Sequence, residues 1–245
     1  NDLSASIDWG DGGTSSCMSG FNAYTHTYSA PGSYIIAVTP GSSNMLFGNS
    51  NASANSIFGV RSGHYSFGAC FRRIEIGSKC VTTGAYAFQY CYGLDEIYIP
   101  NTVTTISAST FRDCRGLTKV RMESNHPGFS LASTYTWYNN YGLQDASFME
   151  HCTTKSPGTY QFYNCASLSK VIIPSVVTSL GNNSYYGCAS LQQMYCYPTN
   201  PPTVSNANVF TNLNPNCVIY VPSSSLNSYK TANNWSTYSS QMVSM

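Results

Sequence analysis

Side chains that could carry out acid–base or nucleophilic chemistry are few in this sequence, and they form no local motif. The four histidines are His26, His64, His126 and His151, and neither G-x-S-x-G nor H-E-x-x-H is present. Only 10 carboxylates occur in 245 residues, which leaves little material for a catalytic pair. We therefore predict no catalytic residue and no enzymatic activity, with the histidines in surface or capping positions.

Two groups of residues resemble metal ligands at first sight. Asp8 and Asp11 lie close together in "DWGDG", but the alternating oxygen ligands and the closing Glu of a calcium loop are missing. The 10 cysteines contain no C-x-x-C pair, which is the usual spacing of zinc ligands. We predict a turn role for the two aspartates, no metal site and no cofactor.

Four cysteines belong to a repeated pattern of the form aromatic-x-x-Cys-x-x-Leu-x-x-apolar-x-apolar. The clearest copies begin at Phe88, Phe111, Phe162 and Tyr185. Weaker copies begin at Tyr65, Trp137 and Phe210. Successive aromatic positions differ by 23, 23, 26, 25, 23 and 25 residues. Self-similarity at such a period predicts a solenoid, in which each copy forms one coil stacked on the next.

Each copy contains a short strand with one buried side. Ile97 and Ile99 lie two residues apart, so they point to the same face, while Tyr98 points outward. The same frame predicts a strand over 146–148 in the copy that begins at Trp137. A proline with no backbone donor follows the strand at Pro100, Pro174 and Pro222 and should end it.

The cysteine position of the pattern should form a column inside the stack. Free buried thiols are favoured there over disulfides, because Cys packs as a small apolar residue. Asn140 takes this position in one copy and must satisfy its amide with backbone groups. The cysteines outside the column are Cys17, Cys70, Cys80, Cys152, Cys196 and Cys217. A bridge among these six remains open, because the sequence does not assign pairings.

The outward strand positions are the candidate binding site. They read Glu75, Tyr98, Arg121, Ser147, Ile172, Tyr195 and Tyr220. Tyr and Arg are enriched in binding hot spots, so we predict that Glu75, Tyr98, Arg121, Tyr195 and Tyr220 contact a partner. The alternative is that these tyrosines only cover the backbone of the sheet. Two residues earlier, the signs of Arg73, Glu96, Lys119, Asp145 and Lys170 alternate, which predicts a ladder of ion pairs that fixes the register.

The composition excludes several kinds of partner. Charged residues make up 9% of the chain and the net charge is +1, so no electrostatic field favours nucleic acid. There is no run of about 18 apolar residues, and we predict no membrane insertion. The polar residues are mainly Ser, Thr, Asn and Tyr, which is typical of secreted proteins. No signal peptide is visible, and we expect any export signal to lie outside this sequence.

The segments "FQYCYGLDEIYIPNTVTTI" and "FYNCASLSKVIIPSVVTSL" resemble the BspA-like leucine-rich repeats, and the resemblance covers about residues 65–222. It implies a β-rich, curved, right-handed solenoid on the surface of a host-associated bacterium, with a role in adhesion. The predicted function is therefore non-catalytic binding of an extracellular protein or glycan, by a monomer, through the exposed strand face. A structural spacer within a larger surface protein is the second hypothesis.

The two ends carry different signals. "IDWGDG" and "HTYSAPGSYIIAVTPG" resemble part of a polycystic-kidney-disease (PKD) β-sandwich, so 1–45 is predicted to be a partial module or an amino-terminal cap. A turn is expected at Pro31-Gly32 and a strand over 33–39. The solenoid of about seven coils is expected over 46–222. In 223–245, Leu226, Tyr229 and Trp235 predict an amphipathic helix that caps the stack.

Overall fold

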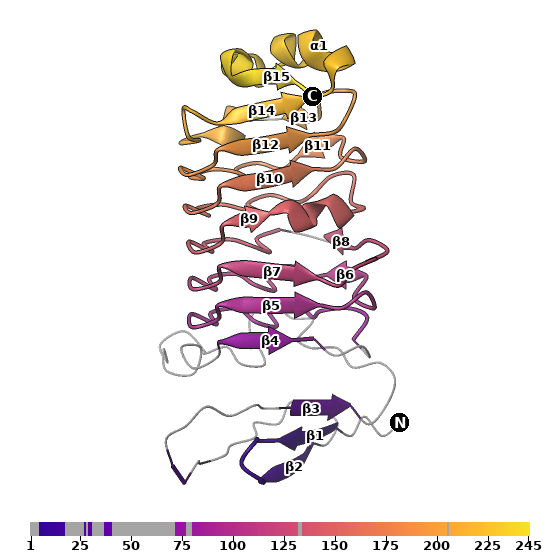
Figure 1. The fold of residues 1–245 in the computed structure, drawn as a ribbon, viewed down its shortest axis with the longest axis vertical. Helices are drawn as coiled ribbons and strands as arrows, with labels where there is room; N and C mark the ends of the chain where they lie inside the picture. The colour runs from indigo at the N-terminus through magenta and orange to yellow at the C-terminus, as the bar shows by residue number, and fades with distance from the viewer. Residues whose placement is uncertain are drawn as a thin grey trace.

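The chain forms a stack of coils, each of which contributes one strand to a parallel ladder (Figure 1). The structure is a computed structural model and describes residues 5–17, 27, 29–30, 37–40, 72–76, 80–131, 134–204 and 206–245. The first parallel sheet contains β4 (Arg73–Glu75), β5 (Glu96–Ile99) and β7 (Lys119–Met122). The second contains β9 (Asp145–Ala146), β10 (Lys170–Ile173), β12 (Gln193–Cys196), β14 (Val218–Val221) and β15 (Met242–Ser244).

The strands pair in the register that the repeat predicts. Ile97 pairs with Ile74 on one side and Val120 on the other, so equivalent positions of successive copies lie side by side. Ile97 and Ile99 are completely buried, which confirms the alternation of inward and outward residues. Strands β5, β10 and β14 each end at the residue before a proline, as predicted. The start of the first copy, at Tyr65, lies outside the described residues.

A column of stacked aromatic rings fills the centre of the coils. The ring centroids of Phe88 and Phe111 are 5.5 Å apart, and those of Phe111 and Trp137 are 4.7 Å apart. Phe162, Tyr185 and Phe210 continue the column at 5.6 and 6.0 Å. Burial of each such ring contributes about 1.5–3 kcal/mol, so the column is a main source of stability between coils.

The cysteine column donates hydrogen bonds from coil to coil. The Sγ of Cys114, Cys165 and Cys188 each donates to the backbone carbonyl of the core aromatic one coil earlier, at 3.0, 3.2 and 3.3 Å. The Nδ2 of Asn140 makes the same contact with Phe111 O at 2.9 Å, so the predicted amide–backbone bond is confirmed for the nitrogen, whereas Oδ1 is buried without a hydrogen-bond partner. Burial raises the pKa of the Cys165 thiol well above its usual value, so the thiol keeps the proton that it donates.

The eight cysteines from Cys80 onward are all buried free thiols. The prediction of free thiols in the column is therefore confirmed. For the cysteines outside the column, Cys80, Cys152, Cys196 and Cys217 are also unbridged. The side chains of Cys17 and Cys70 lie outside the described residues.

A second parallel ladder runs along the return leg of the coils. Here β6 (Thr105–Ile106) pairs with β8 (Ser130–Leu131), and β11 (Ser179–Leu180) pairs with β13 (Thr203–Val204). The 3₁₀ helix η2 (Ala207–Phe210) follows β13. Ile106 and Leu180 are buried, so this ladder closes the core on the side opposite the strand sheet.

The coil that begins at Trp137 departs from the prediction. β9 ends at Ala146, and the 3₁₀ helix η1 (Ser147–His151) follows in place of the predicted strand over 146–148. The chain turns there because the Asp145 carboxylate accepts a hydrogen bond from Ser147 N at 2.6 Å. Phe148 is still buried, with its ring 4.9 Å from Trp137 and 6.4 Å from Phe162. The sheet therefore breaks between β7 and β9.

The carboxyl-terminal segment covers the last coil in Figure 1 with η3 (Ser223–Ser225), α1 (Leu226–Thr231) and η4 (Ser236–Gln241). The prediction of one helix with Leu226, Tyr229 and Trp235 is wrong in extent, because α1 ends before Trp235. Tyr229 and Trp235 are completely buried, and they donate hydrogen bonds to the carbonyls of Pro198 and Pro202 at 2.9 and 2.8 Å. The cap thus supplies donors to carbonyls that no further coil satisfies.

The amino-terminal segment contains a small antiparallel sheet. Its strands are β1 (Ala5–Asp8), β2 (Thr14–Cys17) and β3 (Ala37–Pro40), in the order β2-β1-β3. Asp8 accepts from Gly10 N at 2.9 Å and Asp11 from Gly13 N at 3.0 Å, which confirms the turn role of both aspartates. The turn at Pro31-Gly32 and the start of the predicted strand lie outside the described residues. A PKD-like module over 1–45 stays a prediction.

Candidate binding surfaces

The predicted binding residues near the start of the stack form one patch on the strand face. Glu75, Tyr98 and Arg121 pair in register across β4, β5 and β7. Tyr98 is half-buried and Arg121 is exposed. Partial desolvation and the carboxylates of Glu123 and Glu75 raise the pKa of the Tyr98 phenol, so it remains a hydrogen-bond donor at neutral pH. We name Glu75, Tyr98 and Arg121 the charged strand patch.

The remaining predicted residues form a second patch on β12 and β14. The rings of Tyr195 and Tyr220 stack at 4.6 Å with their planes 9° apart. The Nζ of Lys170, from the coil on the other side of β12, lies 5.6 Å from the centre of the Tyr195 ring. Val243 pairs with Tyr220 and is 40% exposed. We name Lys170, Tyr195 and Tyr220 the tyrosine strand patch.

The two patches are separated by the break in the sheet. Ser147 was predicted to point outward from a strand but belongs to η1, and Ile172, also predicted outward, is only 6% exposed. Ile172 is covered because η1 packs against β10 in place of a flat strand. A small cavity of about 170 Å³ lies at the break, beside Lys119 and Asp145. The five predicted residues therefore form two surfaces rather than one.

The predicted ladder of alternating charges is correct in register but wrong in pairing. Arg73, Glu96 and Lys119 are neighbours across three strands, and Asp145 pairs with Lys170. Among the described residues, however, the ion pairs on this face join Arg73 to Glu75 at 2.6 Å and Arg121 to Glu96. Arg73, Glu75 and Arg121 are more than half exposed, whereas the Glu96 side chain is 20% exposed. The exposed pair of Arg73 and Glu75 contributes only about 0–1 kcal/mol.

A third aromatic surface lies on the turns between the return leg and the strands, and the sequence reasoning missed it. It consists of Arg112, Tyr135, Tyr138, Tyr160, Tyr163 and Tyr186, which we name the turn-face patch. The tyrosines lie either two residues before or one residue after a core aromatic. Aligning these two columns, and not only the strand columns, would have found the patch.

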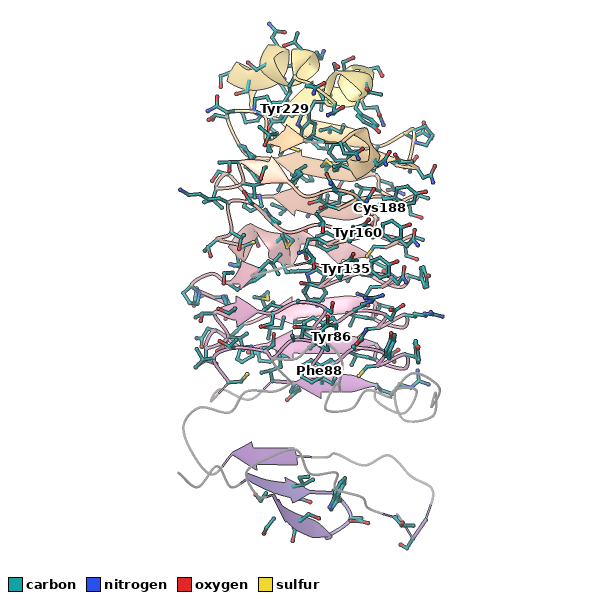
Figure 2. All side chains as sticks on the ribbon, turned by 180° about the vertical axis from the view of Figure 1, so that it is seen from behind. Tyr86, Phe88, Tyr135, Tyr160, Cys188 and Tyr229 are labelled. Carbon is teal, nitrogen blue, oxygen red and sulfur yellow. The ribbon has the colours of Figure 1, made fainter. Side chains whose placement is uncertain are left out.

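The tyrosines of the turn-face patch stack from coil to coil. The ring centroids of Tyr135 and Tyr160 are 4.8 Å apart. The ring centroid of Tyr163 lies 4.9 Å from that of Tyr138 and 4.8 Å from that of Tyr186, and the angle between the planes is at most 9° in each of these pairs. The Arg112 guanidinium covers the first ring of each column, 5.3 Å from Tyr135 and 4.9 Å from Tyr138. Tyr86, Tyr135 and Tyr160 follow one another up the stack in Figure 2.

Backbone hydrogen bonds between coils hold the turns in place. Tyr135 N donates to Thr159 O at 3.1 Å, and Tyr160 N donates to Asn182 O at 2.9 Å. Both tyrosines have left-handed backbone angles, with φ of 63° and 58°. Such angles cost a non-glycine residue about 1–3 kcal/mol. The turn geometry therefore tolerates tyrosine at these positions but does not favour it.

A buried carboxylate lies beneath the turn-face patch. The Asp113 side chain is 6% exposed and lies 3.3 Å from Arg112 Nε and 3.6 Å from Arg115 Nη2. Asn139 Nδ2 donates to it at 3.0 Å, and Asn164 Nδ2 donates to Asn139 Oδ1 at 3.3 Å. The negative charge of Asp113 is thus balanced by the two arginines, and its carboxylate is shielded from solvent.

The histidines within the described residues hold positions in turns. His126 is buried, and its Nδ1 accepts a hydrogen bond from Gly128 N at 3.1 Å, so it takes the capping role rather than the surface role of the two that were predicted. His151 is half-buried and lies 3.6 Å from the Glu150 carboxylate. The two imidazole centres are 6.0 Å apart. His26 and His64 lie outside the described residues.

Stability should decrease in mild acid because of His126. Burial, and to a smaller extent the charge of His151, lowers the pKa of His126, while Glu123 opposes this shift. The unfolded chain therefore takes up the proton first, and stability is lost as pH falls from about 6.5 toward the lowered pKa. His126→Asn keeps a δ acceptor for Gly128 N without titrating. We expect its melting temperature to decline less than that of the wild type between neutral pH and mild acid; equal declines would contradict this role.

Comparison with known proteins gives one clear result. The model of the BspA type leucine-rich-repeat region matches residues 59–157 and 128–236, in 6 copies. A search of curated proteins gives no match.

No helix among the described residues has the length and apolarity that crossing a membrane requires.

Several solved structures are similar to this chain. A leucine-rich cell-surface protein from Faecalibacterium prausnitzii has 19% identity and a TM-score of 0.48, over 71% of this chain and 47% of that one. The leucine-rich-repeat protein of T. pallidum has 16% identity and a TM-score of 0.37, over 64% and 60%. One from Bacteroides ovatus has 18% identity and a TM-score of 0.36, over 61% and 47%. The chain thus spans about half of the length of these proteins.

Proposed function

Because the chain belongs to the BspA-type leucine-rich-repeat family, we propose that it is a non-catalytic binding module on a bacterial cell surface. Its partner would be an extracellular protein or glycan, bound through the strand face. A curved, right-handed solenoid is part of the same proposal, since such a shape would present the strands of both sheets on one side. Adhesion is the role that this module would perform within a longer protein.

The observation that carries the proposal is the composition of the outward strand positions. In the charged strand patch, Tyr98 and Arg121 lie side by side in register, and both are residue types enriched at binding hot spots. In the tyrosine strand patch, Tyr195 and Tyr220 are already stacked, so little side-chain entropy is lost when a partner binds. A spacer would need neither pair.

The test uses one double variant for each patch. Tyr98→Ala with Arg121→Ala, and Tyr195→Ala with Tyr220→Ala, should be compared with the wild type on arrays of extracellular matrix proteins and glycans. We expect at least one double variant to lose tenfold or more in affinity, which is about 1.4 kcal/mol, with an unchanged melting temperature. Lys155→Ala changes an exposed residue of the return leg and serves as the control. Full binding by both double variants would contradict binding through the strand face, and absence of binding by the wild type would favour the spacer.

A further inference from the structure

We propose that the turn-face patch is a second binding surface, separate from the strand face, and that it binds an acidic protein segment. The patch is contiguous, because its two tyrosine columns also contact each other, with Tyr160 lying 5.4 Å from Tyr163 and 6.3 Å from Tyr138. All five tyrosines are half-buried, so each ring is fixed while its edge remains accessible. Rigid Tyr and Arg side chains lose little entropy when a partner binds.

The fold does not require tyrosine in the column that follows the core aromatic. Gln89 and Thr211 take this position in the coils that begin at Phe88 and Phe210. Thr211 O accepts the same coil-to-coil hydrogen bond, from Gly187 N at 2.9 Å, that Tyr163 O accepts from Asn139 N at 2.8 Å. The backbone therefore forms equally well with a small polar side chain.

In the column that precedes the core aromatic, tyrosine is the less favourable choice. Ser109 and Asn183 occupy this position in other coils, with φ of 54° and 56°. Asn is enriched in this left-handed region, whereas a bulky residue is unusual there. Tyr135 and Tyr160 thus adopt an unfavourable backbone conformation although the fold does not need their rings. This indicates that the rings have a role at the surface.

The stacking geometry selects protein over carbohydrate. A sugar ring stacks on a free aromatic face, but Tyr138 has Arg112 on one side and Tyr163 on the other. Tyr163 in turn lies between Tyr138 and Tyr186, and Tyr135 between Arg112 and Tyr160. The three rings covered on both faces therefore offer their edges and hydroxyl groups in rows. Such rows suit the carbonyls and carboxylates of a polypeptide.

Charge around the patch favours an acidic partner. The guanidinium of Arg115 is exposed nearby, while the one carboxylate beneath the patch, Asp113, is buried and already compensated. Beyond Glu150 the sequence contains no Asp or Glu at all, only Lys155, Lys170 and Lys230. Burial raises the pKa of Tyr138 and Tyr163, which keeps their hydroxyls as donors. Electrostatic complementarity of this kind sets partner choice and association rate.

The experiment uses the whole chain and three probes: a synthetic Asp/Glu-rich peptide, the same peptide with Asn and Gln in place of the acids, and a polyuronate oligosaccharide. The variant combines Tyr138→Gln, Tyr163→Gln and Tyr186→Thr, which introduces the residue types that Gln89 and Thr211 show to be compatible with the turn. We expect the wild type to bind the acidic peptide in a salt-dependent manner. The variant should bind it at least tenfold more weakly, with an unchanged melting temperature.

Three results would overturn the inference: no binding of the acidic peptide by the wild type, equal binding by the folded variant, or polyuronate binding as tight as that of the peptide. The variant Tyr195→Ala with Tyr220→Ala should leave peptide binding unchanged. Loss of peptide binding in that variant would place the acidic segment on the strand face and would also overturn the second surface. The array experiments on the strand face are separate, so each proposal can fail without the other.

Discussion

Replacing Phe111 with Ala should lower the free energy of unfolding by about 3–5 kcal/mol. Phe111 is completely buried and stacks between Phe88 and Trp137, at 5.5 and 4.7 Å. Neither neighbour can move into the space, because each is also held by its own coil. Denaturant unfolding monitored by circular dichroism measures the loss directly.

The strands that lose amide protection in Phe111→Ala are as informative as the total loss of stability. In a solenoid, each coil is stabilised mainly by its two neighbours, so Phe111→Ala should increase amide exchange most in β5 and β7. Val176→Ala removes an apolar side chain that is 41% exposed and should change stability by no more than about 0.5 kcal/mol. Equal stability of Phe111→Ala and the wild type would contradict the model of stacked coils.

Replacing Trp235 with Ala should also cost about 3–5 kcal/mol, but at the end of the stack. Trp235 is completely buried, lies 5.0 Å from Phe210 and 5.2 Å from Tyr229, and donates from Nε1 to Pro202 O. Its loss uncovers the last ring of the aromatic column and leaves a buried carbonyl without its donor. We expect fast amide exchange in β14 and β15 while β5 remains protected.

Trp235→Phe separates the two contributions of this side chain. Phe keeps most of the apolar contact but cannot donate a hydrogen bond, so the expected loss is smaller, about 1–3 kcal/mol, for the unsatisfied carbonyl. Light scattering should show self-association of Trp235→Ala, because the exposed end of the stack is apolar. If Trp235→Ala exchanged its amides as slowly in β14 as the wild type, the segment would not act as a cap.

Much of the fold could be predicted because a solenoid is nearly one-dimensional. Ile97 and Ile99 identify the buried side of a strand by their spacing alone, and Pro100 marks its end. The cysteine column followed from the same logic, since a period near 24 residues places equivalent positions one above another. Even the presence of Asn140 at a cysteine position was interpretable, because either side chain can donate to the carbonyl of the core aromatic one coil earlier.

The candidate site was predicted less well, because it depends on which outward side chains meet. An Asx turn at Asp145 replaces a strand with η1, and this local hydrogen bond divides the expected surface into two patches. The ion pairs also differ from the predicted ones. In the part of the chain that the structure describes, Glu96 pairs diagonally with Arg121 and not with its neighbours in the column, Arg73 and Lys119. Such choices depend on side-chain length and on the local backbone, which the repeat pattern does not encode.

The sequence by itself determined the period of the coils, the inward columns and the positions where strands end, because each of these depends on residues within one copy or at a fixed spacing. Only the tertiary structure decided the break between β7 and β9, the donors that the cap supplies to the last coil, and the turn-face patch. The physical reason is that these features arise between coils. Left-handed turns, extra residues in a coil and stacking from one copy to the next set which side chains share a surface.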